Sequence, residues 1–220
     1  MGEAELVRSS NELIIHAIIF LYGDSASEAL SEDVAADIAN HWNAVQGIAE
    51  IDGISYRVQF SIEGRYDAAL TDIDVLSNVN PRHNYFRVED FALGNISFVD
   101  GICSNTGYFL LNNLLDNSTT AAHEFGHTIG LEHPQDLDIR GKGRPGIMYP
   151  RGTLVDPEFQ YDPSVPAGLK GGTMNPFTRL VMQDDIDLLQ LNRLSFNEEG
   201  FAIVGDFSSV WHDKHPTTGL

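Results

Sequence analysis

The strongest indication of fold and chemistry in this chain is one stretch of eleven residues, His123-Glu124-Phe125-Gly126-His127-Thr128-Ile129-Gly130-Leu131-Glu132-His133. His123 and His127 are four residues apart, so on a helix both imidazoles lie on one face and can bind one metal ion. Gly130 can take the left-handed conformation that ends a helix, which lets the chain bring His133 back toward the same ion. Three imidazole nitrogens, each at roughly 2.0–2.1 Å, leave the fourth tetrahedral position of a zinc ion open to water. The pattern therefore predicts a catalytic zinc site.

Glu124 lies between the two helical histidines and flanks the same site. A carboxylate there can take a proton from a zinc-bound water as it attacks a carbonyl carbon, and can then pass that proton to the leaving group. The short form H-E-x-x-H can arise by chance on a solvated helix. The glycine and the third histidine at fixed spacing make the longer pattern specific.

The full pattern, H-E-x-x-H-x-x-G-x-x-H, resembles the signature of the metzincin clan of zinc metallopeptidases. The resemblance implies a zinc-dependent endopeptidase of the EC 3.4.24 type. His123, His127 and His133 would bind Zn²⁺, and Glu124 would be the general base. Protein or peptide would be the substrate, lying extended along the edge strand expected at residues 95–99.

A methionine turn follows the third histidine. Gly146-Ile147-Met148-Tyr149-Pro150 is similar to the Met-turn of the matrix metalloproteinase-like (matrixin) branch, whose methionine forms an apolar floor beneath the histidines and binds no metal. A rival occurs at Gly172-Thr173-Met174-Asn175-Pro176, and Met148 is favoured because Met-Tyr-Pro is the closer match. Tyr149 and Pro150 are candidates for the substrate pocket, and Tyr149 is not expected to bind zinc.

The order of the predicted elements also resembles the metzincin fold. It implies an α+β fold with a twisted, mostly parallel five-stranded sheet, two long helices, the zinc helix and a small irregular C-terminal subdomain. Apolar patterns predict a strand covered on both faces at 13–22, a helix at 31–47, a one-face strand at 54–62, short strands at 84–89, 95–99 and 107–112, and the zinc helix at about 118–130.

The chain is expected to hold a single catalytic domain at 13–220, with an upper subdomain at about 13–130 and a lower one at about 131–220. Residues 1–12 are polar and are expected to be disordered or an added extension. The proline-rich segment 151–178 should wall the pocket for the residue after the cut bond. Residues 183–191 resemble the C-terminal helix of matrixins. A hairpin or clasp is expected at 201–211, followed by a solvated tail that contains His212 and His215.

Charge and composition restrict the partners. The formal net charge of −19 repels nucleic acid phosphates and anionic membranes, so neither is an expected partner. No apolar run is long enough for a membrane span, and no signal peptide is visible in this chain. Cys103 is the only cysteine, so an intrachain disulfide is excluded. A protein of this kind is nevertheless expected to be secreted or delivered outside the producing cell.

Other metal sites have weak signals. Asp72 with Asp74, and Asp136 with Asp138, could bind Ca²⁺, but neither pair forms the spaced loop of an EF-hand, so solvated carboxylates are the favoured interpretation. A second zinc site is doubtful because no upstream histidine cluster is present. His16 is interpreted as a core residue.

Two further hypotheses concern biological role. The run from Met148 through Tyr161 to Met174 resembles the C-terminal toxin domains of bacterial Rhs-type polymorphic toxins, which would imply an inhibitor or immunity protein as a partner. The alternative to a peptidase is a catalytically silent binding module on the metzincin fold. An intact Glu124 argues against that alternative, because a fold kept only for binding does not need the base.

Overall fold

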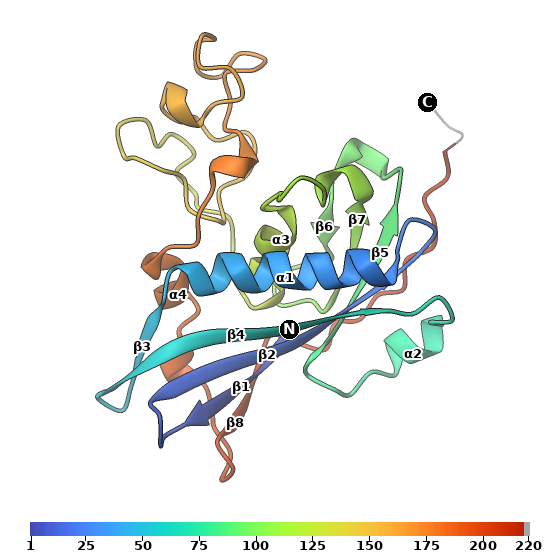
Figure 1. The fold of residues 1–220 in the computed structure, drawn as a ribbon, viewed down its shortest axis with the longest axis vertical. Helices are drawn as coiled ribbons and strands as arrows, with labels where there is room; N and C mark the ends of the chain where they lie inside the picture. The colour runs from blue at the N-terminus through green and yellow to red at the C-terminus, as the bar shows by residue number, and fades with distance from the viewer. Residues whose placement is uncertain (218–220) are drawn as a thin grey trace.

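The computed structural model describes residues 1–217. The strands of this part of the chain form one mixed sheet (Figure 1). The eight strands of the described residues are β1 Gly2–Val7, β2 Glu12–Tyr22, β3 Ile48–Ile51, β4 Ile54–Tyr66, β5 His83–Glu89, β6 Phe98–Val99, β7 Thr106–Leu110 and β8 Phe201–Val204. The α-helices are α1 Glu28–Ala44, α2 Asp72–Leu76, α3 Thr120–Thr128 and α4 Gln183–Leu188. Short 3₁₀ turns are η1 Leu93–Asn95, η2 Leu111–Asn113, η3 Pro157–Phe159, η4 Pro176–Thr178 and η5 Leu191–Arg193.

The sheet is parallel at its centre and antiparallel at its edges. Its main path runs β3-β4-β2-β5-β7-β6. The pairs β4–β2, β2–β5 and β5–β7 are parallel, whereas β3 and β6 pair antiparallel with their neighbours. The α+β class with a mostly parallel sheet is thus confirmed. The sheet is larger than the five strands expected, and α1, with 17 residues, is much longer than α3, with 9.

The N-terminal segment is a strand, so the prediction of disorder for residues 1–12 is wrong. β1 pairs antiparallel with the first half of β2 and with β8. Its side chains alternate, with Ala4 and Leu6 buried on one face and the glutamates on the other. Glu3 forms an ion pair with Arg82, and Glu5 lies 2.8 Å from His16. The polar residues that suggested disorder are therefore the wet face of a paired strand.

Helix α1 packs against the sheet and fixes the position of α3. It begins at Glu28, three residues before the expected Ser31, because the side chain of Ser27 accepts a hydrogen bond from the backbone N–H of Leu30. Trp42 is fully buried, and its indole N–H donates to the carbonyl of Ala122 in α3 over 3.0 Å. This bond joins the long helix to the helix that carries the metal-binding pattern.

Two other strand predictions need correction. β2 is completely buried on one face and only half-buried on the other, so it is not covered equally on both. β4 extends to Tyr66 and forms a hairpin with β3 that was not predicted. Asp52 and Gly53 make the hairpin turn with φ values of 52° and 76°, the left-handed conformation that an Asp-Gly pair favours in a two-residue turn.

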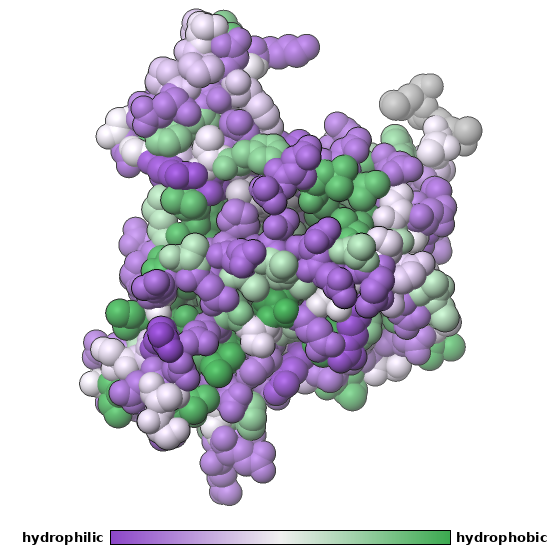
Figure 2. All heavy atoms as spheres, viewed as in Figure 1, coloured by the Kyte–Doolittle hydropathy of each residue, from purple (hydrophilic) through white to green (hydrophobic). Residues whose placement is uncertain are grey.

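Residues 134–180, called the irregular lobe below, project from the sheet body (Figure 1). The lobe has turns and isolated bridges rather than long helices or strands, and it has its own small core of Ile139, Val155 and Met174. Hydrophilic residues cover much of the molecular face in Figure 2, over both lobe and body. Among the described residues, no helix has the length and apolar character needed to cross a membrane.

The C-terminal segment is packed rather than solvated. His212 lies 2.9 Å from both carboxylate oxygens of Asp100, and His215 stacks on Tyr108 with ring centroids 4.0 Å apart. Trp211 stacks on Tyr22 of β2. The prediction of a solvated tail for the two histidines is therefore wrong, because aromatic rings of the sheet provide them with a surface to cover.

Candidate metal centre

The helix that carries the metal-binding pattern is buried along its whole length. Every residue of α3 from Thr120 to Thr128 is buried. The helix ends where Gly130 adopts a φ of 107°, and the backbone N–H of Leu131 donates to the carbonyl of Gly126 over 2.9 Å. The chain then reverses and brings His133 toward the helix, as the spacing of the pattern predicts.

The three predicted ligands converge on one point. The Nε2 atom of His133 lies 3.0 Å from Nε2 of His123 and 3.1 Å from Nε2 of His127. Among the described residues, these three histidines form the group whose ligand atoms lie close enough together to hold a metal ion. Two come from a buried helix, and the third is exposed and immediately precedes the lobe.

Hydrogen bonds on the outer side of the rings fix their tautomers. Nδ1 of His123 lies 2.7 Å from the carbonyl oxygen of Ile147, and Nδ1 of His127 lies 2.7 Å from that of Leu131. A carbonyl only accepts, so both Nδ1 atoms must carry the proton and both Nε2 atoms present lone pairs. His133 could donate one proton to only one of them. A cation at the centre satisfies all three, so this donor set fits zinc.

Electrostatics keep the rings neutral. Burial lowers the pKa of His123, His127 and His133 below the ordinary histidine value, and the positive charge of Arg179 lowers all three further. Metal binding requires neutral imidazole, so the environment prepares these side chains for it.

Glu124 is 7 % exposed and lines the cavity next to His123 and His133. Burial raises the pKa of its carboxyl group to about 8, while the Arg179 charge and a hydrogen bond from the Val99 backbone oppose that rise. A carboxyl group whose pKa lies near neutrality can both take up and release a proton at physiological pH. The structure therefore places a carboxyl group that can exchange a proton near neutral pH in the cavity that His123 and His133 line.

Met148 lies directly under α3. A Cβ atom placed on Gly126 would come within 2.4 Å of the Met148 sulfur, so the glycine makes room for this side chain. The preceding residue, Ile147, accepts the hydrogen bond from His123. Met174, the rival methionine, instead belongs to the core of the lobe.

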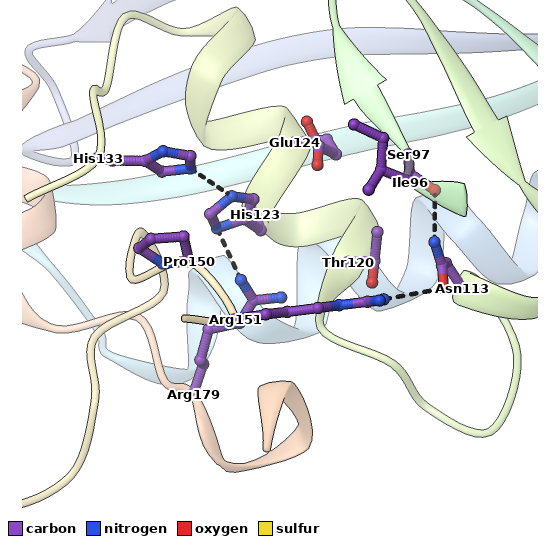
Figure 3. A pocket seen from close by; sticks show the side chains of 10 residues that line it. All are labelled: Ile96, Ser97, Asn113, Thr120, His123, Glu124, His133, Pro150, Arg151 and Arg179. Atoms are coloured by element: carbon purple, nitrogen blue, oxygen red, sulfur yellow. Dashed lines mark hydrogen bonds between the residues drawn. The ribbon is translucent and has the colours of Figure 1, made fainter. Parts of the chain in front are cut away.

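The cavity lies between the body and the lobe (Figure 3). Ile96, Ser97 and Asn113 border it from the body, and Pro150 borders it from the lobe. Tyr149, predicted together with Pro150 as a pocket residue, packs instead against the lobe core. The other residues that line the cavity are Thr120, His123, Glu124, His133, Arg151 and Arg179.

Sequence reasoning missed two arginines of this cavity. Arg179 is only 3 % exposed, and its Nε donates to Thr119 Oγ1 over 2.9 Å and its Nη1 to the carbonyl of Tyr149 over 3.1 Å. Nη1 also lies 2.8 Å from Nδ1 of His123. Arg151 reaches across the cavity and donates to Asn113 Oδ1 over 2.9 Å (Figure 3). The scarcity of cations, 13 against 32 acids, is the one sequence signal that could have drawn attention to them.

The weaker metal candidates are engaged elsewhere. Asp136 pairs with Lys142 and Asp138 with Arg140, each at 2.5 Å. Asp74 caps α2 by accepting from the backbone and the hydroxyl group of Thr71. These contacts agree with solvated carboxylates, and calcium binding stays a prediction.

Comparisons with known proteins give distant matches. No protein-family model matches the sequence, and no curated protein matches it. Among solved structures, the chain is similar to archaemetzincin from Methanopyrus kandleri, with a TM-score of 0.42, 14% identity and coverage of 85% of this chain and 98% of that one. It is also similar to myroilysin, with a TM-score of 0.39, 10% identity and coverage of 88% and 100%. These likenesses do not identify the residues that act, so the chemistry has to come from the side chains of the site.

Proposed function

We propose that this protein is a zinc-dependent endopeptidase. The observation that carries the proposal is the set of three Nε2 atoms, 3.0–3.1 Å apart in its two measured pairs, in which two rings have their protons committed to backbone carbonyls. A cation at the centre would satisfy all three lone pairs. Glu124 lines the same cavity and supplies the carboxylate that hydrolysis needs.

Zinc, when bound, supplies a Lewis acid that acidifies water and polarises a carbonyl group. His123, His127 and His133 would hold the ion, and the carbonyls of Ile147 and Leu131 keep two of the rings in the binding tautomer. Glu124 takes the proton from the attacking water and delivers it to the amine that leaves. Glu124 itself is only 7 % exposed, which limits the access of bulk water to its carboxylate.

The matrixin-like assignment is part of the proposal. Met148 would be the Met-turn methionine, and its contact with Gly126 supports that role because it fills the space beneath the two helical ligands. An extended peptide would lie along β6, the strand at the end of the sheet path, which has a free edge for hydrogen bonds within the described residues. We also propose, from the sequence resemblance to Rhs-type toxins, that the protein acts outside the producing cell and is held by an immunity partner.

The test combines metal analysis with proteolysis of an unfolded protein. Wild type and Glu124→Gln are both expected to bind one zinc per chain. Only wild type should cut the substrate, and the variant should be about 10²–10⁴-fold slower. Glu132→Gln is not a suitable control, because Glu132 directly precedes the ligand His133. Glu158→Gln in the exposed lobe is better and should keep full activity.

Each result has a clear meaning. Zinc in both proteins with cleavage only by wild type supports the peptidase. Zinc in both proteins with no cleavage of any of several unfolded proteins would favour the silent binding module. Absence of zinc from both would contradict the site assignment itself.

A further inference from the structure

The cavity beside the metal centre has a charge opposite to that of the whole chain. The protein carries a formal net charge of −19, yet the charged residues that line this cavity are two arginines and Glu124. A bound zinc ion would add two further positive charges. The cavity is therefore a local cationic site in an acidic protein, and such a site attracts anionic groups.

Arg179 forms no ion pair with any residue of the described chain. It is 3 % exposed, its hydrogen-bond acceptors Thr119 and Tyr149 are uncharged, and the adjacent His123 ring is neutral. No ion pair involving Arg179 is found among residues 1–217, although Glu124 is near enough to raise its pKa. A buried charge without a counter-ion is costly, and a ligand carboxylate that reached it would recover part of that cost.

Arg151 supplies the second cation from the other wall. Its side chain is exposed, and it spans from the lobe to Asn113 of η2 at the cavity border (Figure 3). That hydrogen bond goes to a neutral amide oxygen, which a carboxylate could replace as a stronger acceptor. Arginine presents several donors in a planar fork and so suits bidentate binding of a carboxylate.

The position of Glu124 indicates which part of the substrate enters this cavity. Glu124 delivers its proton to the leaving amine, so that amine must lie on the Glu124 side of the metal. The residue that carries the amine is the one immediately after the cut bond. Glu124, Arg151 and Arg179 line the same cavity, so a side chain of that residue that entered the cavity would meet the two arginines.

We propose that Arg151 and Arg179 make the enzyme select a carboxylate at the residue following the cut bond, that is, aspartate or glutamate. This inference rests on the proposed peptidase function and adds its substrate class. The same carboxylate chemistry could come from the C-terminus of a short peptide, so the test must separate an acidic side chain from a free chain end.

The experiment begins with a peptide library made by digesting denatured proteins, in which mass spectrometry identifies the residue after each cut. Matched peptides with blocked ends then carry glutamate, glutamine or lysine at that position. We expect glutamate to exceed glutamine in kcat/KM by about tenfold or more, the size of one charge-assisted hydrogen bond. A second glutamine peptide ends with a free carboxylate at that residue. It tests whether the arginines bind a chain end rather than an acidic side chain.

Variants of Arg151 are used first, because Arg179 is buried and its replacement could prevent folding. Arg151→Gln should reduce the preference for glutamate several-fold, Arg151→Lys should keep most of it, and Arg151→Glu should favour the lysine peptide. Binding of the same peptides to zinc-loaded Glu124→Gln, followed by fluorescence anisotropy, gives a second measurement that does not depend on turnover. If circular dichroism shows that Arg179→Lys is folded, this variant should also change the preference for glutamate.

The outcomes separate the two proposals. Cleavage and binding that do not distinguish glutamate from glutamine would overturn the acidic specificity and leave the peptidase intact. A preference that survived Arg151→Glu unchanged would also overturn it. A strong preference for the free C-terminus instead would show that the arginines hold a chain end. Loss of cleavage in wild type, with selective binding of the glutamate peptide retained, would contradict the peptidase function but not the carboxylate site.

Discussion

The sheet body and the irregular lobe contribute to the same cavity by different physical means. The body holds His123, His127 and Glu124 on a helix that is buried throughout and joined to α1 by the Trp42 hydrogen bond. The lobe side contributes exposed His133 and Arg151 together with Arg179, on segments that lack long helices or strands. In the proposed peptidase, proton transfer would depend on the buried helix of the body, and substrate selection would depend on the lobe.

The sharpest test of this comparison removes one ligand from each side. His127→Ala and His133→Ala should each weaken zinc binding by about a hundredfold or more, because each ligand supplies a share of the metal-binding energy. The metal-free forms of the two variants should differ in thermal stability. His127 is 8 % exposed, so its loss leaves a cavity in the body, whereas His133 is exposed. Zinc titration and thermal melts of both metal-free variants would measure the two effects.

Equal melting temperatures for the two metal-free variants would break the comparison. They would mean that the buried ligand contributes no more to the body than the exposed ligand does.

The two buried methionines provide the next test. Met148→Ala and Met174→Ala should each cost about 2–5 kcal/mol in the free energy of unfolding of the region that contains them. Met148 packs under α3, so its loss should also weaken zinc binding and loosen the body. Met174 belongs to the lobe core, so its loss should raise hydrogen exchange mainly in residues 134–180. A similar loss of zinc affinity in both variants would remove the distinction.

Asp185 predicts a dependence of stability on pH. Burial raises its pKa to about 6, although hydrogen bonds from the backbone of Met182 and Ile147 oppose the rise. The folded state therefore binds a proton that the unfolded state, with an ordinary carboxyl pKa of about 3.9, releases. The free energy of unfolding should fall by roughly 1–3 kcal/mol as the pH rises from about 4 to 6. Asp185→Asn should remove this fall, as urea unfolding across pH would measure.

Asp184→Asn is the matched control, because Asp184 is the exposed neighbour of Asp185 on the same helix. An identical pH slope in wild type and Asp185→Asn would contradict the prediction.

The smallest effect is expected at the surface of the lobe. Asp136→Asn breaks an exposed ion pair with Lys142, and such pairs contribute little. The melting temperature should stay within the scatter of the measurement. Added Ca²⁺ should not change it in wild type. A calcium-dependent rise that Asp136→Asn abolished would instead identify a calcium site in the lobe.

The metal ligands could be predicted from sequence because their geometry is local. The spacing of His123 and His127 places both on one helix face, and Gly130 marks the helix end. The turn at Gly130 then brings His133 back toward the same face. Arg179 could not be predicted in this way. It lies more than forty residues beyond His133, and only the tertiary fold brings it next to His123.

The strands, too, could be predicted where the signal is local and not where it depends on tertiary contacts. The long alternating run of β4 was predictable, but it extends beyond Ile62 because polar residues continue a strand whose neighbours supply hydrogen bonds. The β3 strand has a usable sequence signal in Asp52-Gly53, a pair typical of two-residue hairpin turns. For β1, the alternation of Ala4 and Leu6 with glutamates was present, but six residues are a weak pattern until β2 and β8 are known to lie beside them.

The pairing of β1 with β8 has a consequence for how the chain folds. Gly2 lies opposite Val204, so this contact joins segments almost the whole described chain apart. Contacts of such high sequence separation carry a large loop-closure entropy and are associated with slow folding. During synthesis, β1 can pair with β2 early but must wait for β8 until the whole lobe has been made. The last strand therefore closes the sheet only after both halves of the metal centre exist.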